Sequence, residues 1–154
     1  MEDYIIQGAR NHIHGIYDFD EDNVKVIGLE EGRATVEATM ATGFSNTRDF
    51  VHGGVLMAIC DMTASAEFYT FGKRNITLQS SFNFTRGVPV DDSSRMICDA
   101  RVVHNGRQTA VVEVEIRDPE GRICVRATFT QFIIGTMSEE DPIPLTPLQK
   151  ARQM

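Results

Sequence analysis

One stretch, residues 53–66, constrains the fold of this chain more than any other. It is almost wholly apolar or small, it is about as long as an ordinary helix, and its one charged side chain is Asp61. A helix that is apolar on every side is a buried helix. Because an unpaired carboxylate is costly to bury, Asp61 needs a partner, a proton or a chemical role. The sequence therefore predicts a buried central helix with a candidate functional residue in its middle.

Two glycines, Gly53 and Gly54, open this stretch directly after His52. Without a Cβ they allow another backbone or a ligand to approach the first turn, where N–H groups point outward without an intrahelical acceptor. Such a helix start favours negative charge. The glycines also fit a purely structural role in close packing between a strand and the helix, and the residues alone leave both roles open.

Segments of alternating apolar residues lie on both sides of the central helix. Residues 24–40 predict a hairpin with its break at 30–33, and four more alternating segments follow Gly72. Residues 2–14 predict a short helix, whereas the tail from Thr136 has no such pattern and is expected to be loosely attached. We therefore expect an α+β fold in which a curved antiparallel sheet wraps around the helix.

The 154 residues are enough for one domain, expected over residues 1–154 with its core at about 24–134 and its tail at 136–154. The net charge of -7 argues against nucleic acid or an anionic membrane as partner. The acidic start of the sequence predicts no secretory signal, and the printed sequence has no apolar run of about 20 residues. Three cysteines without CxxC spacing are interpreted as reduced core thiols. We expect a cytoplasmic protein that binds a small molecule or another protein chain.

No metal site is expected from the histidines. His12 and His14 stand two residues apart and would point to different sides of a helix, so they are interpreted as surface residues. Glu67 is expected to mark the point at which the central helix reaches water.

Residues in and around the central helix resemble the active-site pattern of hot-dog acyl-CoA thioesterases of the phenylacetate-degradation (PaaI-like) type. The resemblance runs from about residue 24 to residue 134 and is most specific over 46–61. It implies the hot-dog fold and an enzyme that hydrolyses the thioester of an acyl- or aryl-acyl-CoA. The residues that carry it are Asn46, His52, Gly53, Gly54, Asp61 and Thr77.

Helix geometry limits what one chain can do with these residues. Gly53 and Asp61 are eight positions apart, which is about 12 Å along a helix, so one chain cannot hold both groups on one reacting atom. A second chain must supply one of them. The resemblance implies the same arrangement: a homodimer with antiparallel central helices, in which each site joins Gly53 of one subunit to Asp61 of the other. Such dimers commonly pair, so a dimer of dimers is expected.

The resemblance also implies a role for each residue. The Gly53 N–H would polarise the thioester carbonyl and hold the oxyanion. Asp61 would act as a nucleophile or as a general base on water, and the sequence leaves both open. Asn46 would orient that water or the carbonyl, Thr77 would hydrogen-bond the carboxylate or the water, and His52 would orient the loop or cap the helix.

No cofactor is required, because coenzyme A is part of the substrate and of the product. By resemblance, its phosphates and pantetheine arm lie along two segments, with Arg107 as a natural phosphate partner. The chain departs from the family here, since a proline usually follows the position of Arg86 but Gly87 stands there and the proline is Pro89. The candidate coenzyme A residues are Phe84, Arg86, His104, Asn105, Gly106, Arg107, Gln108 and Thr109.

The sequence also allows other functions for the protein and structural roles for some of these residues. The same fold can bind acyl-CoA without hydrolysing it, as a sensor or carrier, and tight coenzyme A binding without thiol release would favour that function. A hot-dog dehydratase would instead use a histidine and an acidic residue as its acid/base pair and form an enoyl product. Asp61 could be a structural residue bonded to Thr77 or to backbone, and Arg86 and Arg107 could be plain solvated charges.

Overall fold

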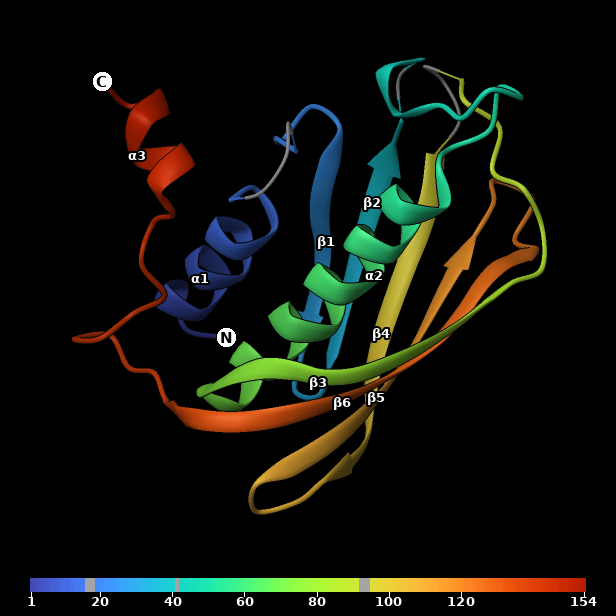
Figure 1. Ribbon diagram of the computed structural model, residues 1–154. Helices are drawn as coiled ribbons and strands as arrows, with labels where there is room; N and C mark the ends of the chain where they lie inside the picture. Colours follow the sequence, from blue (N-terminus) through green and yellow to red (C-terminus); the bar gives the residue numbers. More distant parts are fainter. Residues whose placement is uncertain (16–18, 41, 92–94) are drawn as a thin grey trace.

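The computed structural model describes residues 1–15, 19–40, 42–91 and 95–154. A single antiparallel sheet curves around helix α2, Gly53–Phe68, so the predicted α+β architecture is confirmed (Figure 1). Two further helices are α1, Asp3–Ile13, and α3, Pro147–Arg152. The strands of the sheet are β1 Val24–Glu30, β2 Arg33–Thr39, β3 Lys73–Phe84, β4 Arg95–Asn105, β5 Thr109–Arg117 and β6 Ile123–Thr136.

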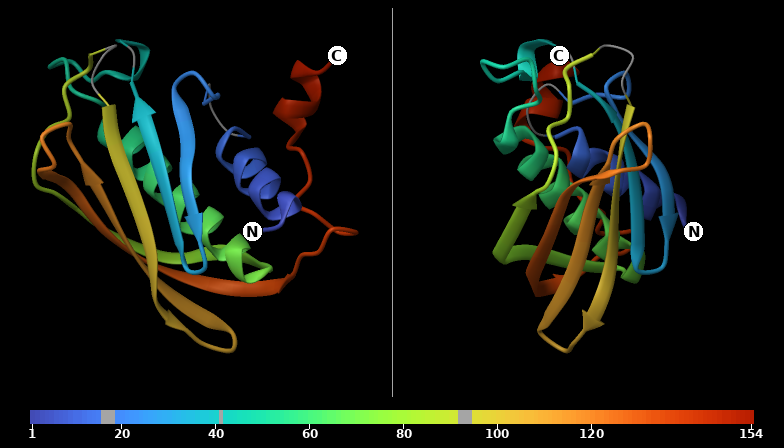
Figure 2. Two further views of the ribbon diagram at one scale, coloured as in Figure 1. Left: turned by 180° about the vertical axis from the view of Figure 1, so that it is seen from behind. Right: turned by 90° about the vertical axis from the view of Figure 1, so that its right-hand side faces the viewer.

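The order of strands in the sheet is β1-β2-β4-β5-β6-β3, and every neighbouring pair is antiparallel. Strands joined by short turns are neighbours, as expected: β1 with β2, β4 with β5, and β5 with β6. β3 follows the central helix in sequence but pairs only with β6, so it forms an edge of the sheet. This edge runs alongside α2 and determines which side of the helix stays uncovered (Figures 1 and 2).

The core lies between α2 and the concave face of the sheet. Inward positions of β2, β4 and β5 are small or β-branched, for example Val36, Ala100 and Val112, each fully buried. Small side chains at these positions allow the sheet to close tightly around the helix. The three cysteines are free and buried, in agreement with their interpretation as core thiols.

The first half of α2 differs from the prediction of a helix buried on all sides. Gly54 is exposed, Met57 is 40% exposed, and Asp61 is half-buried. The reason is the sheet order: the edge strand β3 flanks the helix, and none of the other strands continues past it to cover the first turns. One side of α2 and the edge β3 thus form a continuous open face.

The last half of α2 contradicts the expectation for Glu67. Its side chain is fully buried, and neither carboxyl oxygen has a hydrogen-bond partner among the described residues. Burial raises the pKa of Glu67 to about 9, so it is a neutral acid at pH 7. The helix does not reach water at this residue because Phe68 and Tyr69, which follow it, are also buried.

The expectation that His12 and His14 are surface residues is also wrong. The His12 ring packs edge-on against Tyr69 with 5.6 Å between ring centroids, and its Nε2 is buried. The His14 Nε2 lies 2.7 Å from the carbonyl oxygen of Val24. Both histidines are partly buried because α1 packs beside α2 and β1 rather than standing free in solvent (Figure 2). Among the described residues no His, Cys, Asp or Glu group is arranged to hold a metal ion.

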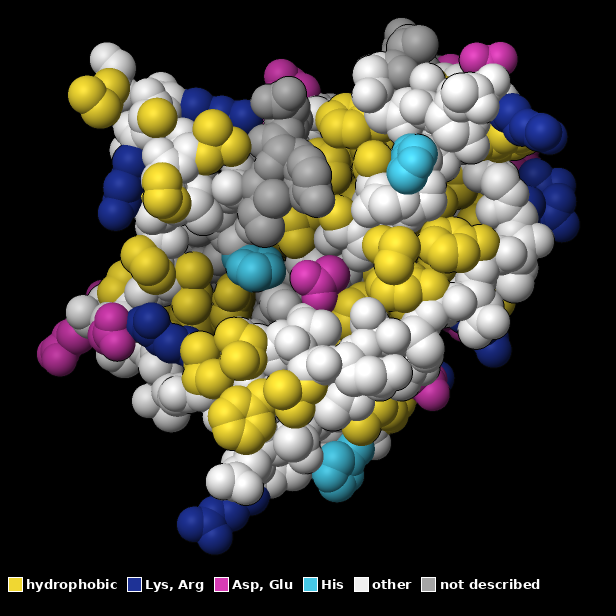
Figure 3. Space-filling view, viewed as in Figure 1, with side chains coloured by type: hydrophobic (Ala, Val, Ile, Leu, Met, Phe, Trp, Pro, Cys, Tyr) yellow, Lys and Arg dark blue, Asp and Glu magenta, His cyan; other side chains and the backbone are white. Residues whose placement is uncertain are grey.

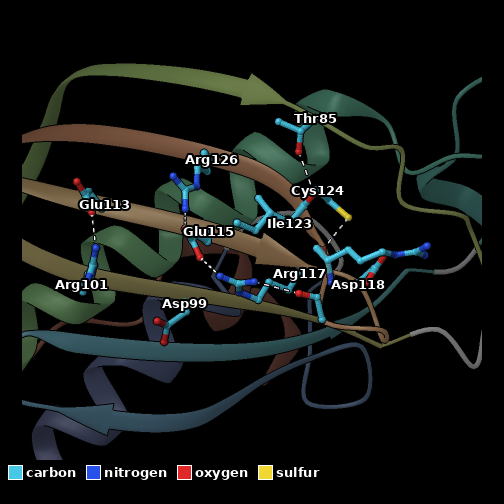
Figure 4. A network of polar contacts seen from close by, with 12 residues as sticks. Thr85, Asp99, Arg101, Glu113, Glu115, Arg117, Asp118, Ile123, Cys124 and Arg126 are labelled. Carbon is cyan, nitrogen blue, oxygen red and sulfur yellow. Dashed lines mark hydrogen bonds and ion pairs between the residues drawn. The ribbon is translucent and has the colours of Figure 1, made fainter.

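The convex face of the sheet is polar. Ion pairs join neighbouring strands across it, such as Arg101 with Glu113 at 2.7 Å and Arg126 with Glu115 at 2.7 Å (Figure 4). These residues are the polar positions of the same alternation that buries Val112 and Val114. This part of the convex face, over β4, β5 and β6, is therefore polar and solvated.

The tail returns to α1, although its predicted loose attachment stays a prediction. The Thr146 hydroxyl donates to the carbonyl of Gly15 at 3.0 Å, and the Gln149 side chain donates to the carbonyl of Asn11 at 2.9 Å. Figure 1 shows α3 next to α1 at the margin of the molecule. Within the described ranges, no helix combines the length and the apolar character needed to cross a bilayer.

Candidate active site

Asp61 lies in the middle of α2 and faces the edge strand β3. Its Oδ1 accepts a hydrogen bond from the Thr77 hydroxyl at 2.6 Å, as expected for this pair. The Thr77 hydroxyl also lies 3.2 Å from Oε1 of Gln131, which is directly opposite Thr77 on β6. Gln131 is fully buried. The carboxylate is therefore held on one side and open on the other, which suits a group that must reach a substrate or a water.

The first turn of α2 is organised by His52. Its extended backbone ends the preceding loop, and its ring Nδ1 accepts a hydrogen bond from the Gly54 N–H at 3.0 Å. Its carbonyl accepts from Val55 and Leu56 at 2.9 Å and 3.2 Å. His52 is thus the helix cap, and the N–H of Gly53 has no hydrogen-bond acceptor among the residues that the structure describes.

A side chain would have different consequences at the two glycine positions, Gly53 and Gly54. A Cβ on Gly54 would lie 3.2 Å from Nδ1 of His52, so a side chain there would press on the cap. A Cβ on Gly53 would meet the Phe84 ring at 3.7 Å, an ordinary contact. Packing within this chain therefore does not demand a glycine at position 53, which weakens the purely structural reading for that residue.

Asn46 organises the loop that leads into α2. Its Oδ1 accepts the N–H groups of Arg48 at 2.8 Å and Phe50 at 3.2 Å, and its own N–H donates to the Phe50 carbonyl at 2.7 Å. Since the side-chain oxygen is engaged by the loop, the Nδ2 group is the part of Asn46 that can serve a ligand. It is a donor, which fits a carbonyl or water oxygen.

Asn46 and Gly53 line one hollow together. The hollow has a volume of about 380 Å³ and lies between the start of α2 and the end of β3. Its lining includes two of the predicted coenzyme A residues, Phe84 and Arg86. The complete lining is Asn46, Phe50, Val51, Gly53, Leu56, Phe84, Thr85, Arg86, Gly87 and Val88. Asp61 and Thr77 are not part of it.

The second predicted coenzyme A segment lies at the other end of β3. His104 to Thr109 cover the end of β4, the turn and the first residue of β5. Here Lys73 donates to Asn105 at 2.9 Å and Ile133 donates to the Gln108 carbonyl at 2.8 Å. Lys73 is the first residue of β3 and Phe84 the last, so about 35 Å of strand separates the two segments. Within one chain, His104, Asn105, Gly106, Arg107, Gln108 and Thr109 do not join Phe84 and Arg86.

Two residues near Asp61 were missed from the sequence. Gln131 contacts Thr77, and its signal was a polar residue at an inward position of β6, between buried Phe129 and half-buried Ile133. The other is His12, whose ring interacts electrostatically with the Asp61 carboxylate. Burial lowers the pKa of His12, and the nearby Asp61 carboxylate acts in the opposite direction. Its place at the end of α1 gave no signal for this proximity.

The part of the chain that forms this geometry is similar to known proteins. The sequence pattern described as Thioesterase superfamily matches residues 49–125, a span that contains Gly53, Asp61 and Thr77. The chain belongs to the thioesterase superfamily. As a member it is a thioester hydrolase, and the PaaI-like resemblance seen in the sequence is confirmed.

Solved structures and a curated relative support this membership. A hypothetical thioesterase of Streptococcus pneumoniae TIGR4, solved with coenzyme A, is 31% identical with a TM-score of 0.72, over 75% of this chain and 92% of that one. A Streptococcus mutans UA159 protein bound to acetyl CoA is 30% identical with a TM-score of 0.74, over 82% and 99%. The acyl-coenzyme A thioesterase PaaI of Escherichia coli K12 is 26% identical over 112 residues, which are 70% of this chain and 79% of PaaI. The hot-dog fold of this thioesterase is confirmed by these likenesses.

Proposed function

We propose that this thioesterase hydrolyses acyl-CoA at an active site shared by two chains, with Gly53 and Asn46 from one subunit and Asp61 and Thr77 from the other. One observation carries the proposal: in the single chain, the hollow lined by Asn46 and Gly53 and the hydrogen-bonded pair of Asp61 and Thr77 lie apart along α2. A half-site with an oxyanion donor and a half-site with a carboxylate each need the other to act on one carbonyl carbon.

The open face of α2 and β3 supports a twofold partner. Four apolar side chains of α2 and of the edge strand β3 are strongly exposed: Met57 at 40%, Ile76 at 50%, Leu78 at 55% and Phe84 at 49%. Hydrophobic side chains gather on this side of the molecule (Figure 3). An apolar edge strand with unpaired backbone groups favours association with another strand. Antiparallel pairing of β3 with its copy would bring the Gly53 end of one chain to the Asp61 region of the other.

The same pairing accounts for the two coenzyme A segments. Phe84 and Arg86 lie at the end of β3, and Arg107 lies in the turn near its start. In an antiparallel pair of β3 strands, the end of one strand meets the start of the other. Arg86 of one subunit and Arg107 of its partner can then hold the phosphates of one coenzyme A.

The chemistry follows from the contacts. The Gly53 N–H, at the positive end of α2, polarises the thioester carbonyl, and the Nδ2 group of Asn46 can donate to the same oxygen or to water. Asp61 either removes a proton from water, which then attacks the carbonyl carbon, or attacks that carbon itself to form an anhydride that water cleaves. The carbon–sulfur bond breaks in both cases, and coenzyme A leaves as the thiol after protonation.

Relatives point to the same pair of residues. Two further structures of the Streptococcus pneumoniae hypothetical thioesterase have an aspartate or a threonine replaced by alanine. These two positions are as far apart along that chain as Asp61 and Thr77 are in this one. The equal spacing supports Asp61 and Thr77 as a functional pair.

The test is release of free thiol from short, medium, long and aromatic acyl-CoA by the wild type and by Asp61→Asn. The proposal predicts turnover with at least one substrate and a loss of about 10³-fold or more in Asp61→Asn, because the variant has neither base nor nucleophile. Tight binding of acyl-CoA without thiol release by the wild type would replace hydrolysis with a sensor or carrier function. A burst of thiol equal to the number of sites would favour the nucleophilic role of Asp61 over the general-base role.

A further inference from the structure

Gln131 lies behind the Asp61–Thr77 pair, in the buried part of β6. It is opposite Thr77 in the strand register, and its side chain is fully buried. Its Oε1 is 3.2 Å from the Thr77 hydroxyl, and its Nε2 has no hydrogen-bond partner among the described residues. An unpartnered buried amide N–H is destabilising, so we expect a neighbouring arrangement in which this group has an acceptor.

The number of protons at Thr77 decides which arrangement is better. The hydroxyl carries one proton, yet it faces two acceptors, Oδ1 of Asp61 at 2.6 Å and Oε1 of Gln131 at 3.2 Å. A half-turn of the terminal amide of Gln131 exchanges its oxygen and nitrogen with almost no change in shape. After this turn Nε2 donates to the Thr77 oxygen and the hydroxyl proton is left for Asp61, while Oε1 takes the position that has no partner among the described residues.

We infer that Gln131 is a positioning residue that fixes the direction of a hydrogen-bond chain from Gln131 through Thr77 to Asp61. The inference rests on the proposed function, since it concerns the same carboxylate. Gln131 itself is too deeply buried to touch the substrate. Its effect is to make Thr77 a donor to Asp61 at all times, so that the remaining lone pairs of the carboxylate face the water or the thioester carbon.

Two substitutions distinguish an effect of Gln131 on the direction of the Thr77 hydrogen bonds from an effect of its packing alone. Gln131→Met removes the amide and leaves Asp61 as the sole acceptor of the two for the Thr77 proton. Gln131→Glu replaces the NH₂ group by oxygen. At this fully buried position the new carboxyl is neutral at low pH, and once it ionises as the pH rises it cannot donate and competes with Asp61 for the Thr77 proton. The hydrogen-bond chain therefore predicts a fall in kcat of about fivefold in Gln131→Met. In Gln131→Glu it predicts a loss that grows to about 50-fold as the pH rises and the new carboxyl ionises, with KM unchanged in both variants.

The experiment is a double-mutant cycle for kcat with Thr77→Val, which keeps the shape of Thr77 and removes its hydroxyl. In the Thr77→Val background the two Gln131 substitutions should change kcat by less than twofold. The control is Phe129→Leu, on the same face of β6 and packed against Phe82 with 5.4 Å between ring centroids. It should lower the melting temperature and leave kcat within about twofold of the wild type.

Equal effects of Gln131→Met in both backgrounds, or a loss in Gln131→Glu that does not grow as the pH rises, would overturn the positioning role and leave a packing role. A second readout does not depend on turnover. In ¹⁵N-labelled protein, the side-chain amide protons of Gln131 should shift upfield in Thr77→Val, and no shift would also contradict the chain. If Asp61→Asn were fully active but the shift occurred, the proposed mechanism would fail while the hydrogen-bond chain would stand.

Discussion

His52 accepts a hydrogen bond from Gly54 through Nδ1 at 3.0 Å, and by doing so it satisfies the second N–H of α2 while the first, that of Gly53, stays available. Gly53→Pro tests that N–H alone. Proline is tolerated at the first helical position, and the extended His52 backbone, with φ −60° and ψ 135°, accepts a following proline. We expect kcat to fall by about 10²–10³-fold, measured by thiol release.

Gly53→Ala is the matched control for this substitution. Its Cβ would stand 3.7 Å from the Phe84 ring, and its N–H is retained. We expect Gly53→Ala to keep most of its kcat and both variants to unfold at similar temperatures. Equal activity of the two variants would rule out the Gly53 N–H as oxyanion donor.

Mixing two inactive variants tests whether the site is shared. Chains with Asp61→Asn retain Gly53, and chains with Gly53→Pro retain Asp61. A hybrid dimer then has one complete site and one doubly defective site, and random pairing of equal amounts should restore about a quarter of the wild-type activity. Co-expressed chains with different affinity tags provide the hybrids, and the measurement is their rate of thiol release. Activity no higher than that of either variant alone would place both residues of each site in one chain.

Leu78→Lys tests the open face as the interface. Leu78 is 55% exposed on the edge strand β3, so the folded single chain tolerates the change, but a lysine at a strand pairing edge opposes association. We expect a smaller hydrodynamic mass and a loss of activity that follows the loss of dimer. Val103→Lys is the control, since Val103 is 49% exposed on β4, away from the edge. A monomeric Leu78→Lys variant with full activity would contradict the shared site.

Glu67 makes the stability depend on pH. Its pKa is raised from 4.5 to about 9 in the folded protein, so the native state binds one more proton than the unfolded state between these values. The free energy of unfolding should therefore fall as the pH rises from about 4.5 to 9, by at most about 1.4 kcal/mol per pH unit. Urea unfolding at fixed protein concentration measures this slope. Glu67→Gln should flatten it, and an unchanged slope in that variant would show that other groups cause it.

The sequence was sufficient to predict most of the secondary structure because its apolar periods are strong. The alternation in Ala110, Val112, Val114 and Ile116 marks the buried face of β5, and all four are fully buried or nearly so. The position of β3 was not predictable in the same way. Its pairing with β6 joins residues about 50 positions apart, such as Thr77 and Gln131, and no turn signal encodes a pairing at that distance.

The residues predicted from the active-site pattern lie at two places in the chain, as the spacing of Gly53 and Asp61 required. Tertiary packing decided the rest. The sequence predicts that the helix reaches water at Glu67, because this residue falls on a different side of the helix from Asp61, yet neighbouring elements cover the last turns of α2. The sequence does not identify Gln131 as a site residue, because a single polar residue in an apolar strand indicates no role until its neighbour Thr77 is known.

The spacing of Gly53 and Asp61 along α2 fixes the distance and the angle between these two groups in every subunit of the assembly. Adding or deleting one residue between them would shift the carboxylate by about 1.5 Å along the axis and about 100° around it. In a twofold pair the error would appear in both sites at once, so neither subunit could compensate for the other. Variation in this family should therefore be concentrated in the loops and the tail, while the length of this one helical segment stays constant.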